Sequence, residues 1–354
     1  MDLNDLRNKI DSIDDQLLTL LNERMQVVKS VGELKRASNA IIYRPEREKA
    51  IVDRLESINT GLLSRSAIEA IFLEIFAVSR NMELPERIAF LGPEGSFTHQ
   101  AAESRFGATS EYVSLKTIKS VFESVDTERV RFGVVPVENN QQGSVIETID
   151  LLGELDVKIV AELPMPIHFT FASKEDRLEK ITKIYSKDIA FRQCRKFIVD
   201  YFGEDIPLVE VASTSKATQL ALENEGTAAI CSHIAAKLYD LPVLFENIED
   251  SQSNFTRFLI ISKNFNNQKG LEDKTSILLK TSNNPGALAS FLKEFEDVGI
   301  NLTKLESRPA REGDSFKYWF LVDFDGHYLD DNVQAILKKH EDSIRFLGSY
   351  VKLC

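Results

Sequence analysis

The chain has 354 residues, of which 43% are hydrophobic and 28% are charged, a composition typical of globular proteins. This length predicts two or three domains, because one hydrophobic core rarely serves so long a chain. The net charge of -12 and the isoelectric point of about 5.1 argue against a nucleic-acid partner, although local clusters of arginine and lysine can still bind small anions.

The sequence carries no signal for export or for membrane insertion. Met1–Asp5 is acidic and lacks the basic and apolar regions of a signal peptide, and no apolar run approaches the roughly 18 residues that span a bilayer. Cys194, Cys231 and Cys354 lie far apart, as in a reducing compartment, and the histidines lack the spacing of metal ligands. We therefore expect a cytoplasmic protein with no metal and no cofactor.

Residues 1–85 predict an all-helical domain. Apolar residues recur every three or four positions over Leu3–Leu34, which indicates one helix of about 35 residues, roughly 50 Å long. Pro45 predicts the start of a second helix. Ser64 is predicted to cap a third helix, which ends before Pro85. Because so long a helix cannot bury its apolar seam within 85 residues, we expect an intertwined dimer.

Residues 86–263 predict an α/β domain, because short apolar strands alternate with helical patterns. The polar run Lys263–Lys274 then indicates a linker. The predicted strands are Ile88–Leu91, Val134–Val137, Ala228–Ile230 and Phe258–Ser262.

Residues 275–354 follow the order strand, helix, strand, strand, helix, strand, which is typical of an α+β ferredoxin-like fold. Asn284 and Pro285 predict a helix N-cap with proline in the first turn. Tyr318–Val322 predicts a strand and Asp330–His340 a helix.

Three cations follow the apolar seam of the long N-terminal helix. Arg24 stands where the repeat calls for a hydrophobic residue, Lys35 lies within about 20° of the same face, and Arg7 flanks the seam near its start. Surface charge would explain one such residue, but three together indicate an anion-binding pocket. Arg7 and Arg24 are roughly 25 Å apart along the helix, too far to contact one small molecule together.

The helical segment contains a set of motifs in a specific order and spacing: Leu6–Asp11, Arg24, Val31–Lys35, Tyr43–Glu48 and the pair Ser79 and Glu83. As a set they resemble the all-helical class of chorismate mutases. The resemblance implies the pericyclic rearrangement of chorismate to prephenate, for which a site must hold two carboxylates and stabilise charge on the ether oxygen.

The resemblance also implies a role for each residue. The carboxylates bind Arg7, Arg24 and Arg47, with Arg7 reaching into the partner protomer's pocket. Lys35 donates to the ether oxygen, and Glu48 binds the ring hydroxyl. The remaining pair of the pattern, Ser79 and Glu83, belongs to the same substrate site.

Two positions depart from a common pattern of that family. Glu83 stands where some members have glutamine, and a carboxyl group donates to the ether oxygen only when protonated. Arg44 stands where some members have aspartate, which leaves the role of Arg44 open.

The central segment contains three polar motifs beside predicted strands. Gly92–Thr98 is a glycine-rich loop, Asn139 follows a buried strand, and Thr256 and Arg257 come just before another. Ordinary turns or a capped strand would explain each motif alone. Together they resemble prephenate dehydratase over residues 87–262.

That resemblance implies a two-lobed, periplasmic-binding-protein-like fold with the active site in the cleft between the lobes. The implied reaction converts prephenate to phenylpyruvate with loss of carbon dioxide and water. Thr256 would donate to the leaving hydroxyl. The substrate-binding candidates are Glu138, Asn139, Ser186, Gln193 and Arg257, although Ser186 stands in a stretch that departs from the family pattern.

The last segment contains two motifs, which comprise Asn284, Pro285, Gly286, Ala287 and Leu288, and then Glu306, Ser307, Arg308 and Pro309. A capped helix and an edge-strand turn would explain them equally well, although a helix N-terminus also suits a carboxylate. The two motifs resemble those of the ACT regulatory domains of prephenate dehydratases. The resemblance implies feedback inhibition by L-phenylalanine through a dimeric interface.

The three resemblances together predict a bifunctional enzyme with chorismate, prephenate and L-phenylalanine as ligands, in a homodimer or a homotetramer. A non-catalytic amino-acid sensor is the main alternative, but it leaves Arg24, Lys35 and Thr256 unexplained. A transcription regulator is disfavoured, because the acidic chain lacks a basic recognition helix.

Overall fold

The computed structural model forms two compact units. One comprises residues 1–86 with 106–111, and the other comprises residues 87–105 with 112–354. Pro85 and Cys354, which the sequence analysis considered, lie outside the described residues. Those residues are 2–37, 43–83, 87–251, 253–281, 284–309 and 318–352, and no helix within them is long and apolar enough to cross a membrane.

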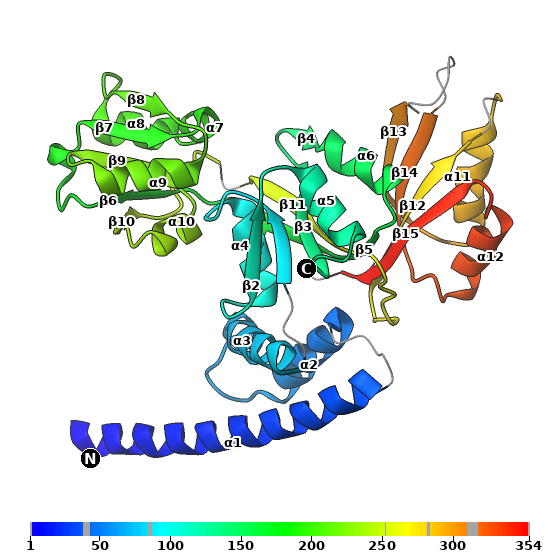
Figure 1. The fold of residues 1–354 in the computed structure, drawn as a ribbon, viewed down its shortest axis with the longest axis horizontal. Helices are drawn as coiled ribbons and strands as arrows, with labels where there is room; N and C mark the ends of the chain where they lie inside the picture. Colours follow the sequence, from blue (N-terminus) through cyan, green and yellow to red (C-terminus); the bar gives the residue numbers. More distant parts are fainter. Residues whose placement is uncertain are drawn as a thin grey trace. The chain divides into compact units, whose positions relative to one another are not determined.

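The N-terminal unit contains the three predicted helices. They are α1 (Leu3–Ala37), α2 (Pro45–Ile58) and α3 (Arg65–Glu83), and Figure 1 shows α1 as one long helix. Ser64 caps α3 as predicted, because its Oγ accepts a hydrogen bond from the backbone N–H of Ala67 at 3.2 Å.

The apolar seam of α1 is exposed in the single chain. A row of large apolar side chains as long as this is typical of a surface that contacts another protein. Relative exposure runs from 46% to 64% at Leu6, Ile10, Ile13, Leu17, Leu20 and Val27.

The second unit begins with an α/β part of two lobes, each built on its own sheet (Figure 1). The first lobe has a sheet in the order β2-β1-β3-β11-β5, with β4 paired to β3. Its strands are β1 (Arg87–Leu91), β2 (Glu111–Leu115), β3 (Phe132–Asn139), β4 (Gly143–Ser144), β5 (Lys158–Pro166) and β11 (Phe255–Ser262), and its helices are α4 (Phe97–Phe106), α5 (Ile118–Asp126) and α6 (Ile146–Glu154).

The second lobe is inserted between β5 and β11 of the first, so the chain passes between the lobes twice. Its sheet has the order β10-β6-β9-β7-β8. The strands are β6 (Thr170–Ser173), β7 (Lys183–Ser186), β8 (Leu208–Glu210), β9 (Thr227–Cys231) and β10 (Val243–Phe245), and the helices are α7 (Asp188–Gln193), α8 (Arg195–Phe202), α9 (Thr214–Glu223) and α10 (His233–Leu238), after a short 3₁₀ turn at Leu178–Lys180.

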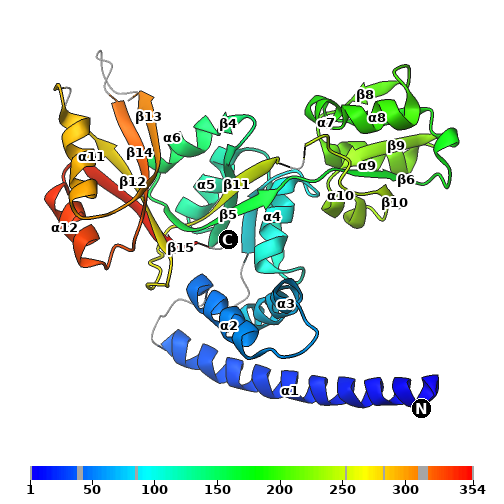
Figure 2. The ribbon, with the colours of Figure 1, turned by 180° about the vertical axis from the view of Figure 1, so that it is seen from behind.

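The rest of the chain forms an antiparallel sheet, the C-terminal sheet, in the order β13-β14-β12-β15. The predicted order of strands and helices is confirmed, and both helices cover the same face of this sheet (Figure 2). The elements are β12 (Asp273–Lys280), α11 (Ala287–Asp297), β13 (Leu302–Pro309), β14 (Tyr318–Asp325), α12 (Asp331–Lys339) and β15 (Ile344–Val351).

The predicted N-cap at Asn284 and Pro285 is wrong. Helix α11 begins at Ala287, and its N-cap is Gly286, which has a φ of 83° and no side chain to cap the helix. This left-handed conformation suits glycine and separates Pro285 from the first helical turn.

The run that predicted a linker is packed against both neighbouring parts. Phe265 and Asn267 are each 5% exposed, and the Asn267 side chain donates to the carbonyl oxygens of Val160 at 2.7 Å and Ser349 at 2.9 Å. The last two residues of the run, Asp273 and Lys274, already belong to β12. The C-terminal sheet is therefore docked on the first lobe, and one hydrophobic core joins them through residues such as Val135, Leu259, Leu278, Leu347 and Tyr350.

Candidate active sites

A cavity of about 500 Å³, here called the N-terminal pocket, lies among α1, α2 and α3. All three helices contribute cations to this pocket, and α2 and α3 also contribute the carboxylates of Glu48 and Glu83. It brings together six residues that the sequence predicted for one site: Arg24, Lys35, Arg47, Glu48, Ser79 and Glu83.

Two contacts connect α1 with α3 inside this pocket. An Arg24 guanidinium nitrogen donates to Ser79 Oγ at 2.6 Å, and Lys35 Nζ donates to Glu83 Oε2 at 2.8 Å. Burial lowers the pKa of Arg24, while the nearby carboxylates of Glu83 and Glu48 act in the opposite direction. The guanidinium remains a cation, and half-burial strengthens its attraction for an anion.

Arg80 is a pocket residue that sequence reasoning missed. It is 6% exposed, pairs with Glu48, and lies over the ring of Tyr43 with 5.6 Å between its guanidinium carbon and the ring centroid. Arg80 is three residues before Glu83 on α3, so helical spacing alone could have placed both on one face. Arg44 lines the pocket too and pairs with Glu46.

Arg7 does not line the N-terminal pocket of its own chain. It lies on the exposed N-terminal part of α1, 17 residues before Arg24. This placement agrees with the expectation that Arg7 and Arg24, roughly 25 Å apart along one helix, do not contact the same small molecule.

Asn139 and Thr256 lie side by side on paired strands of the first lobe. They are register partners on β3 and β11, and Asn139 Nδ2 donates to Thr256 Oγ1 at 2.8 Å. The Asn139 amide oxygen accepts from the backbone N–H groups of Gln141 and Gln142, which fixes the orientation of the amide. Since the Thr256 oxygen already accepts a hydrogen bond, its own proton can be donated elsewhere.

Gln193 joins this pair from the second lobe. It stands at the end of α7, donates to Gln141 Oε1 at 2.8 Å and accepts from Asn254 Nδ2 at 3.2 Å. Asn254 in turn accepts from Asn139 at 2.9 Å. Gln141, Gln193 and Asn254 border a cavity of about 190 Å³, here called the interlobe cavity, and its other lining residues are Arg192, Glu249, Asp250 and Ser251. Asn139 and Thr256 are connected to this lining through the hydrogen bond between Asn139 and Asn254.

Sequence reasoning missed Gln141 and Asn254 as members of this network. Gln141 lies two residues after Asn139 and Asn254 two residues before Thr256, so nearness in the chain was the available signal. Their roles depend on strand pairing, which no single motif specifies.

Three predicted substrate-binding residues do not face the interlobe cavity. Ser186 is fully buried in the second lobe and donates to the carbonyl oxygen of Ile230 at 2.6 Å. Glu138 and Arg257 are the sequence neighbours of Asn139 and Thr256, and alternation along a strand turns them to the opposite face of the sheet. There they pair with each other at 3.0 Å.

The two predicted phenylalanine-binding motifs belong to different elements of the C-terminal part, β13 and the start of α11. Glu306 accepts from Ser144 Oγ at 2.5 Å and Arg308 pairs with Asp150 at 3.0 Å, so these side chains face the first lobe. Ser307 and Pro309 are exposed. The other motif, residues 284–288, leads into α11 on the opposite face of the C-terminal sheet (Figure 2).

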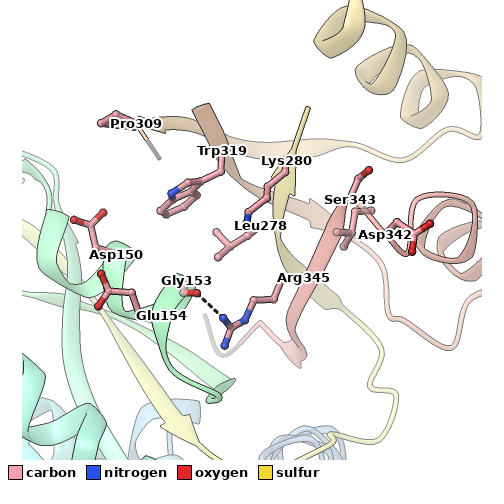
Figure 3. Close-up of a pocket in the computed structure, with 11 residues that line it drawn as sticks. Asp150, Gly153, Glu154, Leu278, Lys280, Pro309, Trp319, Asp342, Ser343 and Arg345 are labelled. Carbon is pink, nitrogen blue, oxygen red and sulfur yellow. Dashed lines mark hydrogen bonds between the residues drawn. The ribbon is translucent and has the colours of Figure 1, made fainter. Parts of the chain in front are cut away.

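A third cavity, of about 400 Å³, lies between α6 and the C-terminal sheet (Figure 3). Leu278 and Trp319 form its apolar wall, and Arg345 donates to the carbonyl oxygen of Gly153 near the end of α6. A cation at that position suits the C-terminal carbonyls of a helix. Pro309 is the one residue of the predicted sites that lines this cavity.

Comparison with known proteins gives two family matches. Residues 88–266 match the family described as prephenate dehydratase, and residues 6–84 match chorismate mutase type II. A bifunctional chorismate mutase/prephenate dehydratase from Aquifex aeolicus is 41% identical over 99% of this chain and 98% of its own length. Its counterpart from Stutzerimonas stutzeri is 38% identical over 98% of this chain and 97% of its own.

A solved structure shares the fold of the second unit. The prephenate dehydratase from Arthrobacter aurescens, in complex with L-Phe, is 31% identical and has a TM-score of 0.67. The similarity covers 75% of this chain and 90% of that one.

Proposed function

Because this chain belongs to the family of bifunctional chorismate mutase/prephenate dehydratases, we propose how its residues divide the two reactions. The enzyme converts chorismate to prephenate, and prephenate to phenylpyruvate with loss of carbon dioxide and water. Each reaction is assigned to one of the two polar sites, the N-terminal pocket and the interlobe cavity.

In the proposed mutase site, Arg24 and Arg47 bind the substrate carboxylates and Lys35 donates to the ether oxygen. The reaction forms no covalent bond to the enzyme, so catalysis consists of holding a compact conformer and stabilising negative charge on that oxygen. The convergence of cations from α1 and α2 on one cavity is the observation that supports this proposal.

Glu48, Ser79 and Glu83 complete the proposed mutase site. Glu48, which Arg80 holds, accepts from the ring hydroxyl of the substrate. Ser79 supports Arg24 through its hydrogen bond. Glu83, the partner of Lys35, donates to the ether oxygen in its protonated form.

A homodimer completes the mutase site in this proposal. The exposed seam of α1 packs against the same seam of a second copy, which buries the apolar row and brings Arg7 of one copy to the pocket of the other. The length of α1 and the position of Arg7 outside its own pocket support this arrangement.

In the proposed dehydratase site, Thr256 donates a hydrogen bond to the departing ring hydroxyl. As the carboxylate leaves as carbon dioxide, its bonding electrons enter the ring and the C–O bond breaks, so the ring becomes aromatic. The oxygen leaves as hydroxide, which takes a proton from solvent to become water. Asn139 orients the Thr256 hydroxyl, and Gln193 contacts the substrate from the second lobe. The Asn139–Thr256 hydrogen bond is the observation that supports these roles.

The C-terminal sheet with α11 and α12 is proposed to be a ferredoxin-like ACT domain that binds L-phenylalanine and inhibits the dehydratase. Its strand order and the L-Phe bound to the Arthrobacter aurescens dehydratase support this proposal. Residues 284–288 of one copy and residues 306–309 of another would form the binding site, at an interface between two copies.

The test supplies chorismate and prephenate to the purified enzyme in separate assays, each with and without L-phenylalanine. We expect phenylpyruvate from both substrates and inhibition of the prephenate reaction. If phenylalanine neither binds in calorimetry nor slows prephenate turnover, the proposed regulatory role is wrong.

A further inference from the structure

A buried cluster of charges lies on the face of β3 and β11 that is turned away from the interlobe cavity. Arg257 of β11 is its centre and pairs with Glu138 of β3 at 3.0 Å and Glu162 of β5 at 3.2 Å. Its third partner is Asp323 of β14, at 3.1 Å, which belongs to the C-terminal sheet. The Arg257, Glu162 and Asp323 side chains are 17%, 5% and 4% exposed, so the pairs are largely shielded from water.

Two lysines of the C-terminal sheet reinforce this connection. Lys274 of β12 pairs with Glu162 at 2.6 Å, and Lys304 of β13 pairs with Glu138 at 2.8 Å. Lys304 also donates to Ser144 Oγ at 3.3 Å, on the short strand β4. Strands β3, β4 and β5 of the first lobe are therefore each joined to the C-terminal sheet by a charged side chain.

The cluster is directly connected to the proposed catalytic pair. Thr256 pairs in register with Asn139, and the next pair along the same two strands is Arg257 with Glu138. Because consecutive residues of a strand share one backbone, a shift of Arg257 also moves Thr256. Gln141 lies on the turn between Asn139 and Ser144, so it depends on the same anchor.

Electrostatics keep the cluster charged. Burial by itself lowers the pKa of Arg257, but Asp323, Glu162 and Glu138 raise it above its ordinary value. The pKa of Glu138 is lowered, since its contacts with Lys304 and Arg257 outweigh the effect of burial. Loss of one member would leave a buried charge without its full set of partners.

We infer that Arg257 is a positioning residue of the dehydratase, which holds Thr256 and Asn139 in their reactive geometry by binding Asp323 of the docked C-terminal sheet. This role replaces the predicted contact of Arg257 with substrate, and it rests on the proposed role of Thr256. The turnover of prephenate then depends on a residue of the C-terminal sheet that lies outside the interlobe cavity. A ligand that moves this sheet would act on catalysis through the same contact.

Asp323→Asn tests the inference, because it removes a partner of Arg257 without changing the first lobe. Asp325→Asn is the matched control, since Asp325 lies on the same strand but pairs with Lys352 of the C-terminal sheet at 2.6 Å. For Asp323→Asn we expect kcat on prephenate to fall about 10-fold with KM nearly unchanged, as for a catalytic group displaced by a fraction of an ångström. Asp325→Asn should keep wild-type kcat, and Asp323→Glu should recover much of the loss.

Equal kcat values for Asp323→Asn and Asp325→Asn would overturn the inference, and so would a rise in KM with kcat intact. If Asp323→Asn does not fold, Lys304→Gln serves in its place, because it weakens the anchor of Glu138 and is expected to lower kcat in the same way. A parallel assay of Thr256→Val separates the two hypotheses. Near-wild-type turnover there contradicts the role of Thr256, whereas an inactive Thr256→Val with an unaffected Asp323→Asn contradicts the positioning role alone.

Discussion

At the scale of single residues, each proposed site depends on one donor whose environment the structure defines. Lys35 reaches Glu83 from α1, and Thr256 receives a hydrogen bond from Asn139. The two donors lie in different units of the chain, so each can be changed while the other activity serves as an internal control.

Lys35→Ala should abolish the mutase reaction and leave the dehydratase reaction intact. Without the ammonium group, no cation is placed to stabilise charge on the ether oxygen, a contribution worth about 10²-fold or more in rate. Chorismate and prephenate turnover are measured separately. Lys29→Ala changes an exposed lysine of the same helix and is the control. Loss of both activities in a folded variant, or of neither, would exclude this role.

Thr256→Val should lower the kcat for prephenate by about 10²-fold, the usual scale for a lost proton donor, with a smaller effect on substrate binding. Valine keeps the shape of threonine and removes only the hydroxyl. Steady-state kinetics on prephenate measure the effect, and an unchanged denaturant midpoint shows that the second unit is folded. A variant that turns over prephenate at nearly the wild-type rate would refute the assignment.

At the scale of elements, the glycine-rich loop between β1 and α4 is closed by a histidine. The backbone N–H of Gly95 donates to His99 Nδ1 at 3.1 Å, and the His99 ring stacks on Phe90 with 4.5 Å between centroids. Burial lowers the pKa of His99 below the ordinary value of 6.5, although Glu103 and Glu94 oppose the shift. The loop therefore depends on a neutral imidazole.

This dependence predicts that the second unit loses stability as the pH falls below 6.5. In that range the unfolded chain binds a proton at His99 and the folded chain does not, so protonation favours unfolding until the pH reaches the lower folded pKa. His99→Asn keeps an acceptor near the Nδ1 position and should reduce the pH dependence. The pH dependence of stability is measured as the denaturant midpoint from about pH 5.5 to about pH 8, in steps of about half a pH unit. Unfolding of the second unit is followed by the loss of dehydratase activity. Identical slopes for both proteins would contradict the prediction.

At the scale of the whole molecule, the mutase site is proposed to need two copies of the chain. The apolar seam of α1 is exposed, and Arg7 lies outside the pocket that contains Arg24. Both observations have one explanation if the α1 helices of two copies pack together.

Complementation between two inactive variants tests this proposal. Arg7→Ala and Arg24→Ala should each lack mutase activity, but a hybrid dimer regains one site in two, with Arg24 from one copy and Arg7 from the other. Random pairing after co-expression then predicts about a quarter of the wild-type activity. The specific mutase activity of the co-expressed mixture is measured against each variant alone. Absence of any recovery, with mixed dimers verified by a tag, would mean that Arg7 does not act across an interface.

The amino-acid sequence by itself determined the elements of this protein and its family. The three N-terminal helices, the Ser64 cap and the strand and helix order of the C-terminal part follow from local periodicity and capping, which act over a few residues. The motifs of the two sites also stand in the chain as short patterns, and they led to the two reactions that the comparisons support.

The tertiary structure decided which of those residues share a site. Arg257 and Glu138 were predicted to contact substrate because they lie in the same motifs as Thr256 and Asn139. Side chains alternate along a strand, however, so these direct neighbours of Thr256 and Asn139 face the opposite side of the sheet. The C-terminal sheet is docked on that other face. The sequence did not predict this docking, because the polar run before the sheet indicated a linker. Contacts such as Arg257 with Asp323 join residues far apart in the chain, and their geometry follows from packing of whole sheets, which no local pattern encodes.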